Sequence, residues 1–70
     1  MAESVYKIIE LVGTSSESWE AAARSAVERA SSTLRDLRIA EVEKLDMTVV
    51  NNKVALYRAR IKLSFKYEEG

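Results

Sequence analysis

The 70-residue chain contains no cysteine and no histidine. Without cysteine it can form no disulfide, and it has no thiolate to bind zinc or to act as a nucleophile. Without histidine it lacks the commonest general base and the commonest metal ligand of proteins. A metal site would therefore hold a hard cation, calcium or magnesium, through oxygen ligands. From these absences we expect a protein that is not an enzyme.

The charge balance and the hydropathy pattern argue against two further kinds of partner. Eleven basic and eleven acidic residues give a net charge of zero, whereas proteins that bind nucleic acid usually carry a basic excess for phosphate contacts. No apolar run approaches the ~18 residues of a membrane span, and the N-terminal segment lacks the pattern of a signal peptide. We expect a cytoplasmic protein with no nucleic-acid partner and no membrane partner.

The length is that of one small domain, residues 1–70. A single core in a chain below ~70–80 residues rarely contributes more than ~3–5 kcal/mol, and such chains usually need a disulfide, a metal or an oligomeric partner. Because a disulfide is excluded, the sequence favours association with further copies of the chain.

Residues 5–12, VYKIIELV, are predicted to form a first strand, which Gly13 would end. Both faces of this strand are mostly apolar, and such a pattern is typical of a strand that is covered on both sides. One helix covers only one side of so small a sheet. We therefore expect another subunit to cover the second side.

A helix is predicted from about residue 17 to residue 35. Thr14 and Glu17 have the spacing of a capping box at its start, and Ser15 and Ser16 are alternative N-caps. Apolar residues then recur at three- and four-residue steps, which predicts an amphipathic helix. They are Trp19, Ala22, Ala23, Ala26, Val27, Ala30 and Leu34.

Two further strands are predicted in the second half of the chain. Residues 38–49, RIAEVEKLDMTV, alternate imperfectly, and the slip of the apolar phase between Val42 and Leu45 indicates a β-bulge or a strong bend. The Asn51–Asn52 pair predicts a tight turn, because asparagine tolerates positive φ. In residues 54–67 apolar and polar side chains alternate, so the apolar face of this strand should meet the helix. That face consists of Tyr57, Ala59, Ile61, Leu63, Phe65 and Tyr67. The predicted class is α+β, with the element order β-α-β-β.

The polar row of the third strand is cationic and consists of Arg58, Arg60, Lys62 and Lys66. One interpretation is that these cations pair with carboxylates of the neighbouring strands, which stabilises a sheet modestly; the candidates are Glu10, Glu41, Glu43 and Asp46. The other interpretation is that the row binds an anionic ligand such as a phosphate. The aromatic residues are expected to pack in the core: Trp19, Tyr57, Phe65 and Tyr67.

The chain resembles the dodecin family, from VYKIIELVGTSSESWEAAARSAVERA through LRIAEV to YRARIKLSFKY. The likeness covers about residues 4–67, and the ELVGTS junction is its most specific part. It implies a three-stranded antiparallel sheet that is partly wrapped around one helix. It also implies a homododecamer, a hollow shell that stores or sequesters flavins (riboflavin, FMN or FAD) at its subunit interfaces.

The resemblance further implies where a flavin would bind. In dodecins a tryptophan of the second strand stacks on the flavin ring and a glutamine of the third strand contacts its edge; the matching positions are Ile39 and Arg58. Isoleucine has no π-face, so ~1–1.5 kcal/mol of stacking is absent, and arginine cannot accept a hydrogen bond as glutamine can. Lys66 matches a cation near the ligand phosphate, and Asp46 and Arg38 complete the candidate cofactor-binding residues.

Some dodecins without the stacking tryptophan bind calcium. The resemblance therefore also implies an alternative function, a calcium-binding dodecin-type assembly that does not bind flavin. The candidate metal ligands are Glu43 and Asp46, since carboxylate oxygens suit calcium.

Overall fold

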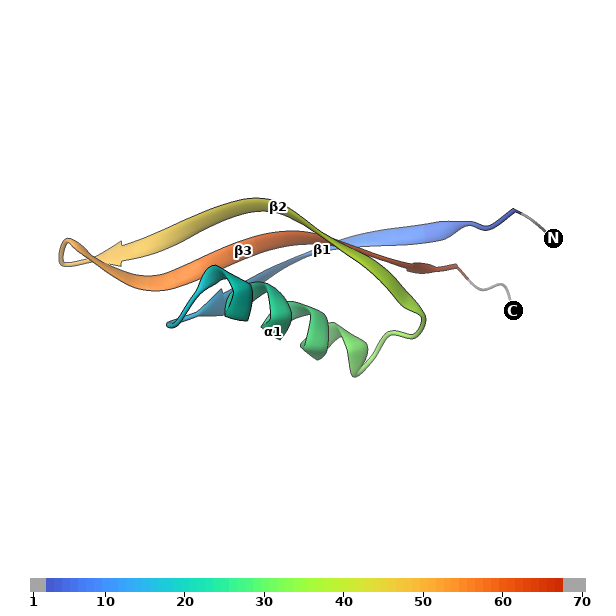
Figure 1. The fold of residues 1–70 in the computed structure, drawn as a ribbon, viewed down its shortest axis with the longest axis horizontal. Coiled ribbons are helices and arrows are strands. Elements are labelled where there is room, and N and C mark those ends of the chain that lie inside the picture. The colour runs from blue at the N-terminus through green and yellow to red at the C-terminus, as the bar shows by residue number, and fades with distance from the viewer. Residues whose placement is uncertain (1–2, 68–70) are drawn as a thin grey trace.

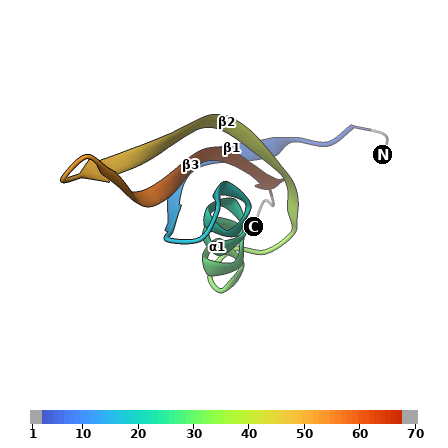
Figure 2. The same cartoon turned by 60° about the vertical axis from the view of Figure 1, so that its left-hand side comes forward.

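Three strands and one helix make up the fold (Figure 1). The structure, a computed structural model, describes residues 3–67. Strand β1 (Tyr6–Ser15) leads into helix α1 (Trp19–Ser31), and strands β2 (Leu37–Val50) and β3 (Lys53–Lys66) follow as a long hairpin. The sheet is antiparallel with the order β1-β3-β2, and it curves over α1 (Figure 2). The predicted α+β class and the β-α-β-β order are confirmed.

Helix α1 begins later than the capping-box pattern predicts. Its N-cap is Ser18, whose backbone is extended and whose side-chain oxygen accepts a hydrogen bond from the N–H of Ala21 at 3.0 Å. Ser15 instead accepts the N–H of Glu17 in a local turn. The predicted N-caps at positions 14–16 are therefore wrong, because the hydroxyl of Ser18, which is closer to the first turn, accepts a backbone N–H of that turn.

The helix also ends earlier than residue 35. The hydroxyls of Ser31 and Ser32 donate to the carbonyls of Glu28 and Arg29 at 2.7 Å, so the last carbonyls are satisfied by side chains as well as by backbone. The chain then turns, and Asp36 has a φ of 59°. Within residues 3–67 no helix is long and apolar enough to cross a membrane.

Gly13 does not end β1 as predicted; it lies inside the strand, opposite Ala59 of β3. A Cβ at this position would overlap the carbonyl oxygen of Ala22 and would lie 3.0 Å from the Cβ of Ala26. The absence of a side chain is therefore what lets α1 approach the sheet so closely.

The β2–β3 hairpin confirms the predicted turn and the predicted bulge. Asn51 and Asn52 have φ values of 54° and 64°, as a tight hairpin turn with two left-handed residues requires. The register shifts between Val42 and Lys44, which leaves Glu43 as the extra residue of β2. Two further irregularities lie at Leu37/Ile39 and Thr48/Val49.

The core lies between α1 and the strands β1 and β3, and it is small. Its buried apolar members within residues 3–67 are Ala22, Ala26, Ala30, Ala59, Ile61 and Leu63. Only two of them are large, because alanines line the buried side of the helix. The expectation that Tyr67 packs in the core is wrong for the single chain, in which this side chain is exposed.

Candidate functional site

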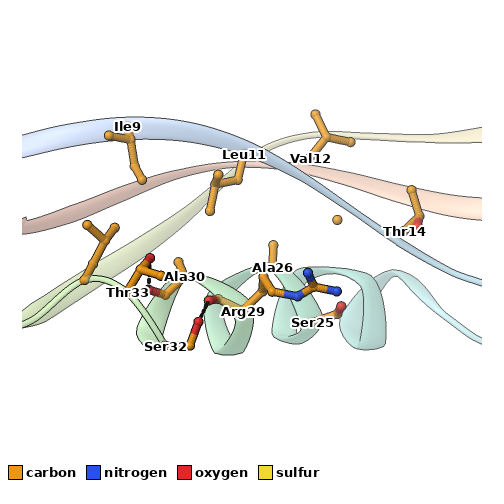
Figure 3. Close-up of a pocket in the computed structure, with 12 residues that line it drawn as sticks. Ile9, Leu11, Val12, Thr14, Ser25, Ala26, Arg29, Ala30, Ser32 and Thr33 are labelled. Atoms are coloured by element: carbon orange, nitrogen blue, oxygen red, sulfur yellow. Dashed lines mark hydrogen bonds between the residues drawn. The ribbon is translucent and has the colours of Figure 1, made fainter.

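The face of the sheet that points away from α1 is called the open face here. Ala59, Ile61 and Leu63 of β3 are buried, so the alternate residues of β3 and their cross-strand neighbours point the other way. In the close-up, Ile9 and Leu11 point toward the helix and Val12 points away from it (Figure 3). The open face has five exposed large apolar side chains on β1 and β2: Tyr6, Ile8, Val12, Ile39 and Val49.

Arg58 and Asp46 form a bidentate ion pair on the open face. Arg58 Nε donates to Asp46 Oδ1 at 2.7 Å, and Arg58 Nη2 donates to Asp46 Oδ2 at 2.9 Å. The hydrogen bond from Arg58 is the main cause that holds the pKa of Asp46 below its ordinary value, and the charge of Arg60 adds to the effect. The same bond raises the pKa of Arg58. The guanidinium is therefore already occupied by a carboxylate.

Lys62 lies among three carboxylates. Its Nζ is 3.2 Å from Glu43 Oε2, and Glu10 and Glu41 oppose it on β1 and β2. The hydrogen bond to Glu43 is the first cause that raises the pKa of Lys62, and the charges of all three carboxylates contribute. The interpretation of the cationic row as cross-strand pairs is thus confirmed for Arg58 and Lys62.

Arg60 and Lys66 have no ion-pair partner within residues 3–67. Lys66 lies opposite Tyr6 of β1 and is exposed. Among the described residues no carboxylate therefore neutralises Lys66, and anion binding at this position stays a prediction.

The two candidate metal ligands lie on the same strand but are separately engaged. Glu43 pairs with Lys62, and Asp46 pairs with Arg58. Across residues 3–67 no three carboxylates come together as a group that could hold a metal ion. A calcium ion bound by these two residues would need further oxygen ligands.

The candidate flavin residues form two separate groups within one chain. Ile39 is 66% exposed and lies opposite Ser64 on β3, two positions from Lys66, and Arg38 is next to it at the irregularity of β2. Arg58 lies six positions from Ser64, which at ~3.4 Å per residue amounts to about 20 Å. Hence Ile39 and Lys66 lie at one end of the open face, with Arg38 adjacent to Ile39 in the chain, and Asp46 with Arg58 lies toward the hairpin.

A groove of about 560 Å³ runs between β1 and α1 on the other side of the sheet (Figure 3). Apolar side chains such as Ile9, Leu11 and Ala30 line it, and Arg29 is its one cationic side chain. The sequence did not predict this groove. The groove is open because the alanines of α1 that line it are small. The spacing of these alanines in the sequence predicted an apolar face of the helix, but it did not predict an empty space beside that face.

The comparisons with known proteins agree with this architecture. The family model for dodecins matches residues 5–68. The curated relatives include the calcium dodecin of Mycobacterium tuberculosis, which is 46% identical over 63 residues, 90% of this chain and 89% of that protein. They also include the dodecin of Thermus thermophilus, which is 43% identical over 65 residues, 93% of this chain and 94% of that protein.

Solved structures give the same result. The dodecin from Streptomyces coelicolor superposes with a TM-score of 0.93 at 38% identity and covers 100% of both chains. The calcium dodecin of Mycobacterium tuberculosis, described as a calcium-chelating immunodominant antigen with a novel calcium-binding site, superposes with a TM-score of 0.83 at 44% identity. It covers 96% of each chain.

Proposed function

The chain belongs to the dodecin family, and on that premise we propose that it sequesters a small ligand within an assembly of identical copies. The observation that carries this proposal is the open face. There a row of large apolar side chains, Ile39 among them, is exposed beside cations and carboxylates. Exposed apolar surface that is bordered by polar residues is typical of interaction sites in soluble proteins.

The need for an assembly follows from the small core. Only Ile61 and Leu63 are large and fully buried, whereas apolar side chains of β2 on the helix side, such as Val42 and Met47, are nearly half exposed. A chain of this size rarely gains enough stability from its own core. We propose a homododecamer, in which neighbouring copies cover these surfaces. Sedimentation velocity at dilute concentration tests it: the expected particle has about twelve times the 7.9 kDa chain mass, and a stable single chain would overturn the proposal.

The ligand that this site favours is a flavin, held between copies against Ile39. The isoleucine offers apolar contact to a planar ring, and the nearby Lys66 offers a charge to a ligand phosphate. Arg58 contributes less, because Asp46 occupies its guanidinium. Since the isoleucine gives no aromatic stacking, we expect weaker flavin binding than with a tryptophan at this position. Titration of FMN fluorescence tests the proposal, and an unchanged emission at micromolar protein would contradict it.

Calcium is the second candidate ligand, and one observation favours it: the relative with 46% identity is a calcium dodecin. The carboxylates of the open face, Glu43 and Asp46 with those of other copies, would be its ligands. Calcium would then compete with Lys62 and Arg58 for these oxygens. Thermal melting with added calcium and with a chelator separates the two candidates, because bound calcium raises the melting temperature by mass action. Equal midpoints would count against calcium.

The proposed role is binding rather than catalysis. The carboxylates of the open face that have partners, Asp46 and Glu43, form ion pairs with Arg58 and Lys62, so both side chains are already engaged in holding the sheet together.

A further inference from the structure

A separate hollow lies at the N-terminal end of α1, on the helix side of the sheet. It has a volume of about 420 Å³, within the range of small-molecule sites. Its lining consists of Glu17, Ser18, Trp19, Glu20, Leu45 and Tyr57. None of these residues belongs to the candidate ligand residues of the open face.

Two aromatic rings form adjoining walls of this hollow. The ring centroids of Trp19 and Tyr57 are 5.1 Å apart, and their planes meet at 72°. The indole N–H of Trp19 donates to the carbonyl of Asp46 at 3.0 Å, which fixes the ring against β2. Both rings were expected in the core, yet both are only partly buried. Aromatic faces of this kind attract a cation through the ring quadrupole.

Two carboxylates and one apolar side chain complete the surroundings. Glu17 and Glu20 are exposed, and neither has an ion-pair partner within residues 3–67. Leu45 is about half exposed and offers contact to alkyl groups. Aromatic, apolar and carboxylate groups together are the chemistry that recognises an alkylated ammonium ion.

The start of a helix ordinarily favours an anion, and here that outcome is opposed. Ser18 already satisfies two backbone donors, since its Oγ accepts the N–H of Ala21 and its carbonyl accepts the N–H of Ala22. The carboxylates of Glu17 and Glu20 also repel an anion. The positive end of the helix dipole works against a cation too, so the attraction rests on these carboxylates and the rings.

From this geometry we propose that the hollow binds small organic cations whose nitrogen carries alkyl groups, of which tetramethylammonium is the simplest. The site is independent of the proposed ligand site on the open face. It is therefore expected to bind such cations whether or not the assembly binds flavin or calcium.

The test is a titration of the assembled protein with tetramethylammonium chloride against sodium chloride at equal ionic strength. Trp19 is the single tryptophan of the chain, so its fluorescence reports on this site. We expect a saturable change of emission and an upfield shift of the methyl proton signal, because the methyl groups lie over ring faces. tert-Butanol is a neutral molecule of similar shape. Its affinity should be lower by a factor of about three or more, as expected from the loss of an exposed cation–π contact.

Variants locate the site. Glu17→Gln combined with Glu20→Gln should weaken tetramethylammonium binding about threefold or more, whereas Glu28→Gln, on the same helix outside the hollow, should leave it unchanged. Tyr57→Phe should retain binding, since the ring is kept. No saturable response in the unaltered protein, an equal response to tert-butanol, or equal effects of the two glutamine variants would each overturn the proposal.

Discussion

Asp46 and Arg58 are joined across β2 and β3 by two hydrogen bonds of 2.7 and 2.9 Å. Two-pronged pairs between a carboxylate and a guanidinium are among the stronger hydrogen-bonded contacts in proteins. The resemblance to dodecins implies that Arg58 takes the place of a glutamine that would contact the edge of a flavin ring. Its guanidinium can meet a ligand there only by leaving Asp46, which makes Lys66 the better placed cation for an anionic group.

The first prediction concerns acid. Because hydrogen bonding from Arg58 lowers the pKa of Asp46 below its ordinary value of 3.8, the pair contributes stability that is present above that value. This contribution is lost as the pH falls through the lower value of the folded state. We expect Asp46→Asn to lower the melting temperature slightly at pH 7. Between neutral and acid pH the melting temperature of this variant should then fall less than that of the unaltered chain.

Melting curves between about pH 6 and pH 2 at fixed protein concentration measure this effect. Glu28→Gln, which removes an exposed carboxylate of α1 that has no ion-pair partner within residues 3–67, is the control. An acid dependence of Asp46→Asn that runs parallel to that of the unaltered chain would show that the pair adds nothing to stability.

The second prediction concerns Gly13. A methyl group at this position would overlap the backbone of Ala22, so Gly13→Ala should push α1 away from the sheet. Overpacking of this kind costs ~1–3 kcal/mol or more, and each kcal/mol lowers the melting temperature of a domain of this size by ~4–8 °C. Ser25→Ala, at an exposed helix position that lines the groove, should change the melting temperature little. Equal melting temperatures for Gly13→Ala and the unaltered chain would show that the helix can move away at no cost.

The fate of Gly13 shows which features the sequence could and could not predict. Strand alternation is a property of local geometry, so it correctly placed Ala59, Ile61 and Leu63 against the helix. The role of Gly13 depends on its contact with Ala22 of α1, which exists only in the folded chain. A glycine after an apolar run therefore resembled a strand end.

The ends of the helix and the arrangement of the candidate site residues could not be predicted from the sequence, for related reasons. The stripe of alanines predicted α1, but local hydroxyl bonds of Ser18 and Ser31 set its two ends. The family positions Ile39 and Arg58 were identified from the resemblance, whereas their separation of about 20 Å along the sheet depends on the register of β2 and β3. Surfaces that other copies would cover in the proposed assembly leave only an apolar pattern in the sequence.

The third prediction is a gain of flavin binding. Ile39→Trp places a large aromatic face on the exposed end of the open face, where isoleucine is 66% exposed. Stacking of ~1–1.5 kcal/mol beyond contact area corresponds to roughly a five- to tenfold tighter Kd, with stronger quenching of flavin fluorescence. Val50→Trp, an exposed position near the hairpin turn, is the matched control. Equal affinities of the two tryptophan variants for riboflavin would place the ligand elsewhere.

The fourth prediction separates the phosphate from the ring. Lys66 has no ion-pair partner within residues 3–67, so Lys66→Ala should weaken the binding of FMN and leave that of riboflavin nearly unchanged. The loss should be larger at low salt, because salt screens an exposed charge. Parallel titrations of both flavins at two ionic strengths measure it. A loss for riboflavin as large as that for FMN would mean that Lys66 acts through packing.

The last prediction concerns the apolar row of the open face. Ile8 of β1 is 60% exposed in the single chain, and other copies should cover it if the assembly forms through this face. A carboxylate buried there without a partner is costly, so Ile8→Asp should shift the sedimenting particle toward smaller species and lower the melting temperature. Glu28→Asp, which changes an exposed side chain of α1 without altering its charge, should leave the particle size unchanged. Because assembly and stability are linked by mass action, the defect of Ile8→Asp should also grow on dilution, and a particle of unaltered size at every concentration would exclude this part of the open face from the contacts between copies.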